Sequence, residues 1–178
     1  MRWELHRVAD LTEIEQAGVR TLTVAVYRPE VSSAWPGRAF EWTAHQWAVV
    51  GWDAEGSALC YVGVVLRDAR WGDRAVRVGG IGGVKTHPAY RGRGFATTAI
   101  RMALDFFRER GDVDFGLLVC EPNLVPFYER LGWRTFLGDL LVAQRQTTVP
   151  FTFNLPMTTP VRLQEHLTGA IDLMGAPW

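Results

Sequence analysis

The pattern of apolar and polar positions changes its period near the middle of the chain. Residues 76–85 form a β-like run, whereas the residues after Gly94 carry apolar side chains at the three- and four-residue spacing of a helix with one buried face. The apolar stripe of this helix consists of Ala96, Ala99, Ile100, Ala103, Leu104, Phe106 and Phe107. Arg108 and Arg110 suit the negative end of the helix dipole, and Gly111 can form a left-handed cap. The pattern therefore predicts a strand, a loop and a helix in succession.

The N-terminal segment shows the same kind of alternation on a smaller scale. It predicts a short strand over Trp3–Val8 and a helix from Leu11 to about Tyr27. Asp10 is the expected N-cap of the helix, and Glu13 follows three residues later in a capping-box pattern. Pro29 is expected to end the helix.

Two further strands are predicted between this helix and the central strand. They cover residues 46–52 and 59–67 and are joined by a turn at residues 53–56, while a second turn at residues 71–74 leads into the central strand. Three antiparallel strands in a row follow from these short turns. Residues 113–120 form another apolar run, and the helical crossover before it predicts a strand parallel to the central one.

The C-terminal third is predicted to hold a short helix and two more strands. They are a helix over Leu124–Leu131 with Asn123 as its cap, and strands over Thr135–Gln144 and Thr148–Leu155. Pro156 and Pro160 are expected to interrupt the chain beyond the second strand.

The loop Arg91-Gly92-Arg93-Gly94 carries the clearest candidate chemistry. The first amides of a helix have no partner within the helix, the helix dipole adds partial positive charge, and glycine lets the backbone approach a ligand closely. A diphosphate would fit such a loop, although a loop of this composition can also be a connection alone. The spacing of the surrounding residues favours the binding site.

Two motifs in order resemble the GCN5-related N-acetyltransferase (GNAT) superfamily. Arg91-x-x-Gly94-x-Ala96 is similar to the acetyl-CoA signature of that family, and Leu117–Cys120 followed by Pro126–Trp133 resembles its later strand and its Phe-Tyr-x-x-x-Gly-Phe/Trp helix. The motifs cover about residues 76–136. The resemblance implies an α+β, three-layer GNAT fold with a mixed, mainly antiparallel sheet of about seven strands and helices on both faces. It implies a single domain over residues 1–178, with the C-terminal strand and tail at 147–178.

The resemblance also implies acetyl-CoA as cosubstrate. Its diphosphate would lie on the amides of residues 91–96, its pantetheine would pair with the central strand, and its thioester would lie beside residues 82–84. The cofactor-binding residues implied are Val84, Lys85, Thr86, Arg91, Gly92, Arg93, Gly94, Phe95 and Ala96. The implied activity is acetyl transfer to a primary amine of a small molecule, such as an antibiotic or metabolite, by direct attack in a ternary complex. A protein or peptide amine, and a CoA-binding sensor without catalysis, remain alternatives.

The proposed acid and base of this reaction come from the same comparison. Tyr128 matches the tyrosine that commonly acts as general acid in the family, although it could also be a half-buried aromatic residue of the short helix. For the general base, Glu121 at the end of its strand is the first choice. His87, His45 or a water chain that reaches a carboxylate are the alternatives.

A narrower resemblance concerns the aminoglycoside 2'-N-acetyltransferases. Trp178 matches the C-terminal tryptophan of that branch, whose carboxylate reaches the acceptor site, but Gly82 and Ala176 stand where the branch carries acids. The resemblance therefore implies the architecture of the branch with a different or less basic acceptor. The aromatic loop that contains Trp35, Phe40 and Trp42 fits an acceptor pocket, or else a packing patch. The substrate-binding residues expected are Trp35, Phe40, Trp42, Gly82 and Trp178.

Composition narrows the classes of partner. With 178 residues, 48% of them hydrophobic, the chain can form one domain with a substantial core. Lys plus Arg and Asp plus Glu number 19 each, so no basic excess points to nucleic acid or to an anionic membrane. Cys60 and Cys120 lie in apolar runs without metal-ligand neighbours, which predicts two buried free thiols, no metal and a reducing compartment. Without an apolar leader segment, a cytoplasmic protein is expected, and the family suggests a homodimer.

Overall fold

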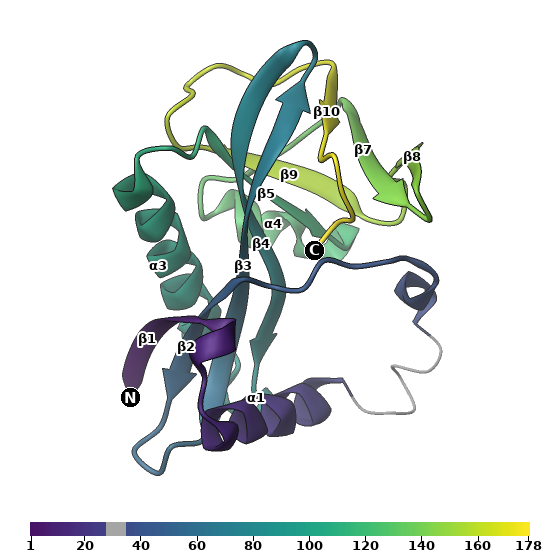
Figure 1. Cartoon of the computed structure of the whole chain (residues 1–178). Coiled ribbons are helices and arrows are strands. Elements are labelled where there is room, and N and C mark those ends of the chain that lie inside the picture. The colour runs from purple at the N-terminus through teal and green to yellow at the C-terminus, as the bar shows by residue number, and fades with distance from the viewer. Residues whose placement is uncertain (28–34) are drawn as a thin grey trace.

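The computed structural model describes residues 1–27 and 35–178, and it contains one mixed sheet of ten strands with helices on both faces (Figure 1). The strands are β1 (Arg2–Arg7), β2 (Trp47–Trp52), β3 (Ala58–Trp71), β4 (Arg74–Thr86), β5 (Phe115–Cys120), β6 (Arg134–Thr135), β7 (Asp139–Gln144), β8 (Thr147–Pro150), β9 (Leu155–Pro160) and β10 (Ala170–Asp172). The α-helices are α1 (Glu13–Val26), α3 (Phe95–Arg110) and α4 (Val125–Glu129). The expected mixed, mainly antiparallel sheet is confirmed, with more strands than the seven expected.

The strands follow the order β6-β9-β5-β4-β3-β10-β7-β8. Outside this order, β2 pairs with β3, and β1 pairs with β2. Strand β3 is 14 residues long, so β2 pairs with its first half and β10 with its last two residues. All pairs are antiparallel except β4 with β5 and β10 with β7. The parallel arrangement predicted for β4 and β5 is therefore confirmed.

Strands β4 and β5 pair over only three residues each, Val78–Gly80 with Phe115–Leu117. Beyond Gly80, β4 continues to Thr86 with β3 as its neighbour, while β5 continues beside β9. The two strands thus separate, and within residues 1–27 and 35–178 no strand pairs with the edge of β4 from Ile81 to Thr86 that faces away from β3. An extended chain can add to such an edge through main-chain hydrogen bonds.

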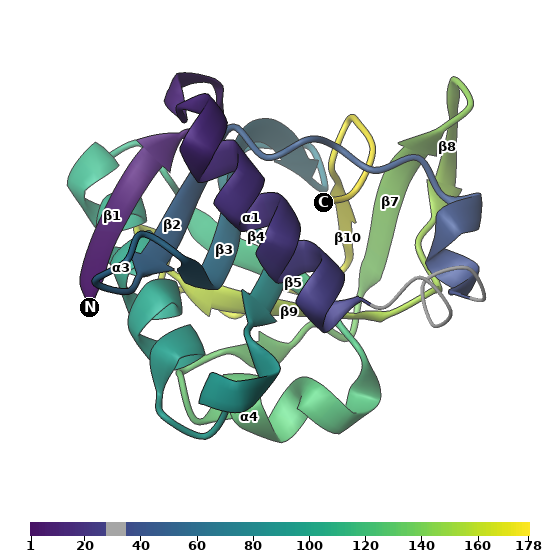
Figure 2. The same cartoon turned by 90° about the horizontal axis from the view of Figure 1, so that it is seen from below.

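The two faces of the sheet are covered by different helices because side chains alternate along each strand. Ala48 and Val50 of β2 pack in one cluster with Leu22 of α1. The intervening Val49 belongs to the cluster that contains Phe107 of α3. Figure 2 shows α1 crossing over β2, β3 and β4 on its own face. Among the described residues, none of the helices has the length and apolar content needed to cross a membrane.

The start of α1 differs from the prediction. Its N-cap is Thr12 rather than Asp10, and the capping box joins Thr12 to Glu15 rather than using Glu13. Asp10 lies in a preceding 3-10 turn, after which Leu11 turns into the core with 5% of its surface exposed. Burial of Leu11 therefore delays the helix by two residues. Pro29 lies outside the described residues.

The C-terminal strands also differ from the prediction. The segment expected as one strand is divided into β8 and β9, and β9 contains Pro156 and Pro160 instead of ending before them. The carbonyl of Pro156 accepts a hydrogen bond from Phe136 N–H, so the proline nitrogen faces the same edge, just past the end of the two-residue β6. A missing N–H is tolerated there because no ladder continues. Asn123 does not cap α4, whose N-cap is Leu124.

Candidate functional site

The glycine loop leads directly into α3 and leaves its first amides free. Gly92 and Gly94 both have φ of 77°, which favours glycine, and a Cβ at either position would meet no atom within 4 Å. Gly94 is the N-cap and provides no side-chain cap, and helical bonding starts with Thr98 N–H to Gly94 O at 3.0 Å. Within the described residues, the amides of residues 92–97 donate no hydrogen bond. They lie at the positive end of a 16-residue helix, where such amides can bind an anion.

Two arginines of this loop add positive charge beside the free amides. Arg91 and Arg93 are exposed, and neither forms an ion pair with a carboxylate in the part of the chain that the structure describes. The Arg93 guanidinium lies 5.0 Å from the centre of the Tyr90 ring, which in turn stacks on Phe95. The loop thus combines backbone donors with two cationic side chains.

The unpaired edge of β4 begins at a bulge. The register with β3 shifts between Tyr61 and Gly63, and Gly83 takes a φ of 56° there. A Cβ on Gly83 would come within 2.7 Å of the His45 ring. The bulge therefore needs glycine both for its backbone conformation and for the approach of His45. Val84, Lys85 and Thr86, which follow it, are half-buried.

Trp178 lies over Gly80 and Gly82, on the face of β4 that His45 also covers. Its indole covers Gly80, where any Cβ would overlap the ring, and its Nε1 donates to Leu117 O at 3.4 Å. Its carbonyl carbon lies 2.9 Å from where a Gly82 Cβ would be. The Arg67 guanidinium lies 5.4 Å from the centre of the indole ring. Glycines 80 and 82 thus make room for Trp178 at the point where β4 and β5 separate.

His45 lies beside Trp178, above the bulge. Its Nε2 is 3.0 Å from the position of a Gly82 Cβ, and its Nδ1 is 3.1 Å from the Tyr61 hydroxyl. Burial, and then the positive charge of Lys85, lower the pKa of His45 to about 4, so the imidazole is neutral at neutral pH. Burial raises the pKa of Tyr61 to about 12, which keeps the phenol protonated.

Lys85 completes this cluster on the face covered by α1. Its Nζ donates to Thr23 Oγ1 at 3.0 Å and lies 4.3 Å from the centre of the Tyr61 ring. Burial lowers the pKa of Lys85 to about 8. The cluster of Lys85, Tyr61 and His45 therefore holds one amine, one phenol and one neutral imidazole next to the unpaired edge of β4.

Tyr128 and Glu121 lie at the far end of β5. Tyr128 is buried in α4 with 5% of its surface exposed, and burial, followed by Cys120 and Tyr27, raises its pKa. Glu121 is exposed, and its carboxylate contributes to the raised pKa of Tyr27 at the end of α1, where burial is the larger cause. No hydrogen bond among the described residues links either side chain to His45. His87 accepts a hydrogen bond from Ala89 N–H at 3.3 Å and caps a turn.

The aromatic loop before β2 packs against itself and against the C-terminal strands. Trp35 stacks on Trp42 with ring centres 5.6 Å apart, and Phe40 lies 5.5 Å from both Phe151 and Phe153. Most of this aromatic surface is therefore used in packing, although Trp35 keeps 40% of its surface exposed.

The segment that carries this loop toward His45 is tied to the C-terminal residues. Thr43 N–H donates to Pro177 O at 2.6 Å and Thr43 Oγ1 donates to Ala176 O at 2.8 Å. Figure 1 shows the C-terminal end beside the segment that leads into β2. Arg67 donates to both Ala176 O and Thr43 Oγ1, so it holds the two segments together.

A model of the acetyltransferase (GNAT) domain matches residues 7–136, which is most of the chain. The protein belongs to the GNAT acetyltransferase family. No curated protein gives a match. A GNAT family N-acetyltransferase (YhbS) from Escherichia coli in complex with CoA is 18% identical, with a TM-score of 0.65 over 98% of this chain and 91% of that chain.

Two further solved structures share the GNAT fold at low identity. Naa20 from Chaetomium thermophilum in complex with a bisubstrate analogue is 15% identical, with a TM-score of 0.59 over 97% of each chain. A GNAT family acetyltransferase from Brucella melitensis in complex with acetyl-CoA is 20% identical, with a TM-score of 0.52 over 75% of this chain and 83% of that chain. These structures show the fold, and the GNAT resemblance drawn from the two motifs is confirmed.

The sequence prediction missed several residues that surround the candidate site. Tyr61 and Arg67 were not identified, and Lys85 was expected to contribute only through its backbone. The position of Tyr61 in a strand that pairs with β4 could have indicated that it lies near the site. The sequence does not reveal the bulge, however, and the bulge determines which β4 residue Tyr61 faces.

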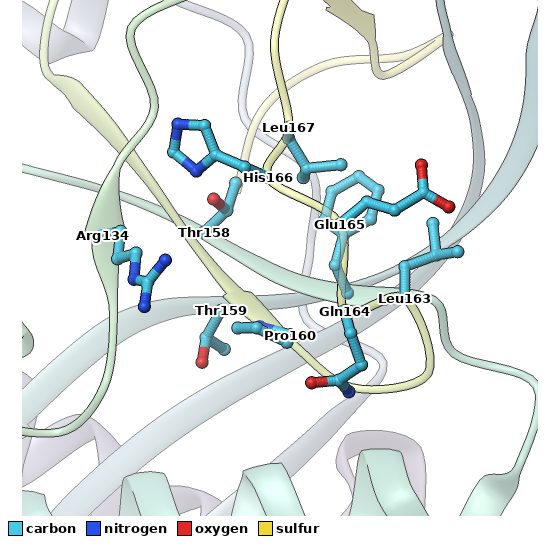
Figure 3. Close-up of a pocket in the computed structure, with 10 residues that line it drawn as sticks. Arg134, Thr158, Thr159, Pro160, Leu163, Gln164, Glu165, His166 and Leu167 are labelled. Carbon is cyan, nitrogen blue, oxygen red and sulfur yellow. The ribbon is translucent and has the colours of Figure 1, made fainter.

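A separate hollow lies near the start of β5, away from the glycine loop (Figure 3). It is lined by Phe115, Arg134, Thr158, Thr159, Pro160, Leu163, Gln164, Glu165, His166 and Leu167. Its volume of about 30 Å³ has room for a water molecule but not for an organic substrate. This hollow is therefore not a candidate for the acceptor site.

Proposed function

We propose that this GNAT protein transfers the acetyl group of acetyl-CoA to a primary amine of a small molecule by direct attack within a ternary complex. The observation that carries the proposal is the meeting of three features along β4. They are the free amides that open α3, the unpaired edge from Ile81 to Thr86, and the neutral imidazole beside Gly82. The free amides can bind an anion, the unpaired edge can pair with an extended amide chain, and the imidazole can accept a proton.

The chemistry of acetyl-CoA fits these residues. Its diphosphate matches the amides of residues 92–97 and the side chains of Arg91 and Arg93, and its pantetheine amides match the backbone of residues 84–86. Acetyl-CoA supplies the acetyl group as a thioester and leaves as a thiol. The GNAT neighbours with CoA or acetyl-CoA support the same cosubstrate.

We assign the general base to His45 ahead of Glu121. A base must be uncharged or anionic at working pH and must lie near the proton that it removes. His45 is neutral and its Nε2 is beside Gly82, whereas the Glu121 carboxylate is exposed at the end of β5. When Nδ1–H of His45 donates to the Tyr61 oxygen, the lone pair of Nε2 is free to accept a proton from an amine.

Tyr128 is proposed as the hydrogen-bond donor to the leaving thiolate. Burial raises the pKa of Tyr128, so the phenol is always protonated but is a weak acid. A thiol resembling cysteine has a pKa near 8.5, so complete proton transfer from Tyr128 is unfavourable. Tyr128 therefore acts mainly by a hydrogen bond that strengthens as negative charge develops on sulfur.

The acceptor is proposed to be a small amine with few positive charges. Gly82 and Ala176 provide no carboxylate where the aminoglycoside 2'-N-acetyltransferases have acids, and the guanidinium group of Arg67, which lies beside Trp178, is cationic. Like charges disfavour a polycationic aminosugar. The architecture of that branch remains part of the proposal through Trp178, whose indole and carbonyl group border the same space.

The test combines calorimetry of acetyl-CoA binding with a thiol-release assay. The acceptor panel contains arylalkylamines, amino acids, polyamines, aminoglycosides and peptides. Binding with release of thiol on a weakly charged amine supports the proposal. Release only with peptides would replace the small-molecule acceptor, and tight binding without release on any amine would favour a non-catalytic CoA-binding protein.

A further inference from the structure

Lys85 is the single lysine of the chain, among 19 lysine and arginine residues. Arginine remains protonated in proteins, whereas a buried lysine readily loses its proton and can then act as a nucleophile. The only side chain of this protein that combines a primary amine with that property therefore lies in β4. The amine of Lys85 therefore lies in the candidate site along β4.

The surroundings of Lys85 favour the uncharged amine. Among the described residues, its Nζ donates one hydrogen bond, to the uncharged Thr23 Oγ1 at 3.0 Å. No carboxylate forms an ion pair with it among residues 1–27 and 35–178. Burial lowers the pKa of Lys85 to about 8, so about half of the amine is neutral at pH 8.

Lys85 is also close to the position that the proposed function gives to the thioester. It follows the Gly82–Gly83 bulge by two residues on the same strand. Its Nζ lies over the Tyr61 ring, and the Tyr61 hydroxyl is 3.1 Å from Nδ1 of His45, which lies above that bulge. The lysine side chain is a flexible four-carbon stem, so its amine can leave Thr23 and turn toward Gly83.

We propose that Lys85 is an internal acceptor, and that the protein acetylates this amine from acetyl-CoA bound along β4. The inference rests on the proposed function. The neutral Nζ attacks the thioester carbonyl carbon, a C–N bond forms and the C–S bond breaks. One proton leaves Nζ and the sulfur takes up one proton, so the products are acetyl-Lys85 and the CoA thiol.

Acetylation would change the charge of the site. The ammonium group of Lys85 is the second cause of the lowered pKa of His45, after burial. Its conversion to an amide removes that positive charge and the cation–π contact with Tyr61. Self-acetylation therefore acts on the same imidazole that we assign as base.

The experiment incubates the purified full chain with acetyl-CoA and no amine, followed by intact-mass measurement and peptide mapping. One acetyl group on Lys85 is expected, at a rate independent of protein concentration. Lys85→Arg should lose the modification. Gly94→Glu should slow it about 30-fold at low acetyl-CoA because the diphosphate site is damaged. Gly111→Glu, with the same substitution at the other end of α3, should retain it.

A second readout needs no acetyl-CoA. The rate at which a succinimidyl acetate reagent labels Lys85 should rise with pH around a midpoint near 8. Among the described residues, Tyr61 and His45 are the titratable groups that face the amine. A midpoint near 10.5, the ordinary value, would contradict the neutral amine.

The outcomes separate this inference from the proposed function. If acetyl-CoA binds and an external amine is acetylated while Lys85 stays unmodified, the inference is wrong and the proposed function stands. Equal labelling of Lys85 in Gly94→Glu and Gly111→Glu would identify simple chemical acetylation from solution and would also overturn it. If calorimetry detects no acetyl-CoA binding, both proposals fail.

Discussion

A glutamate at position 94 tests the diphosphate site with a matched control. Gly94 begins α3 and Gly111 ends it, with φ of 77° and 69°, and a Cβ at either position meets no atom within 4 Å. Gly94→Glu and Gly111→Glu therefore carry the same left-handed strain, about 1–2 kcal/mol, without a steric clash. Only the first variant puts a carboxylate beside the free amides of residues 92–97.

The loss of affinity follows from Coulomb repulsion. Two like unit charges about 4 Å apart repel by about 1 kcal/mol in water and by about 4 kcal/mol near a protein surface. The loop is exposed, so the lower figure applies, and the two charges of a diphosphate give about 2 kcal/mol. This corresponds to an increase of about 30-fold in the Kd for acetyl-CoA. Salt should reduce the difference, because exposed charges are screened.

Calorimetry of acetyl-CoA binding at two salt concentrations measures the effect, and thermal unfolding checks that both variants fold equally. Gly94→Gln, which has the same shape without the charge, should fall between the wild type and Gly94→Glu. Equal Kd values for folded Gly94→Glu and Gly111→Glu would refute the anion site at the start of α3.

The remaining predictions concern the residues proposed for catalysis and for the acceptor site. Tyr128→Phe should lower kcat about 100-fold without changing the Kd for acetyl-CoA, measured by thiol release and calorimetry, and an unchanged kcat would remove its role. His45→Gln should lower kcat by at least about 100-fold while Glu121→Gln leaves it unchanged, and the reverse result would make Glu121 the base. Because the pKa of His45 is about 4, its neutral form persists through neutral pH and the rate profile should show no His45 inflection near pH 6.5. Trp178→Ala should lower the free energy of unfolding by about 3 kcal/mol and raise the acceptor KM, and unchanged values for both would contradict its place on Gly80.

Local signals made the central part of the fold predictable. The period of the apolar residues gave the strand and helix on either side of the glycine loop, and Gly111 does form the left-handed cap of α3. The start of α1 was harder because two candidate boxes overlap, Asp10 with Glu13 and Thr12 with Glu15. Only the burial of Leu11, a tertiary contact, selects the second box.

The C-terminal strands depend on neighbours that the sequence does not name. Proline is unfavourable within most strands because it lacks an N–H. Pro156 nevertheless fits in β9, because the neighbouring strand β6 ends where the missing N–H would be needed. Strand β10 is three residues long and pairs with the end of β3, so its own pattern is too short to identify. Pairing between strands that are far apart in the sequence therefore determines both β9 and β10.

The candidate site illustrates how one bulge decides the chemistry. Gly63 pairs with Gly82, so a regular ladder would put Tyr61 opposite Val84, but the bulge at Gly83 puts Tyr61 opposite Lys85. A shift of one residue exchanges the two faces of a strand. Without it, an apolar side chain would face Tyr61 and the amine would point to the other side of the sheet. The glycines explain where such a bulge can form, but its register depends on the fit of His45 over Gly63 and Gly83. The proximity of Lys85, Tyr61 and His45 is therefore a property of the folded sheet.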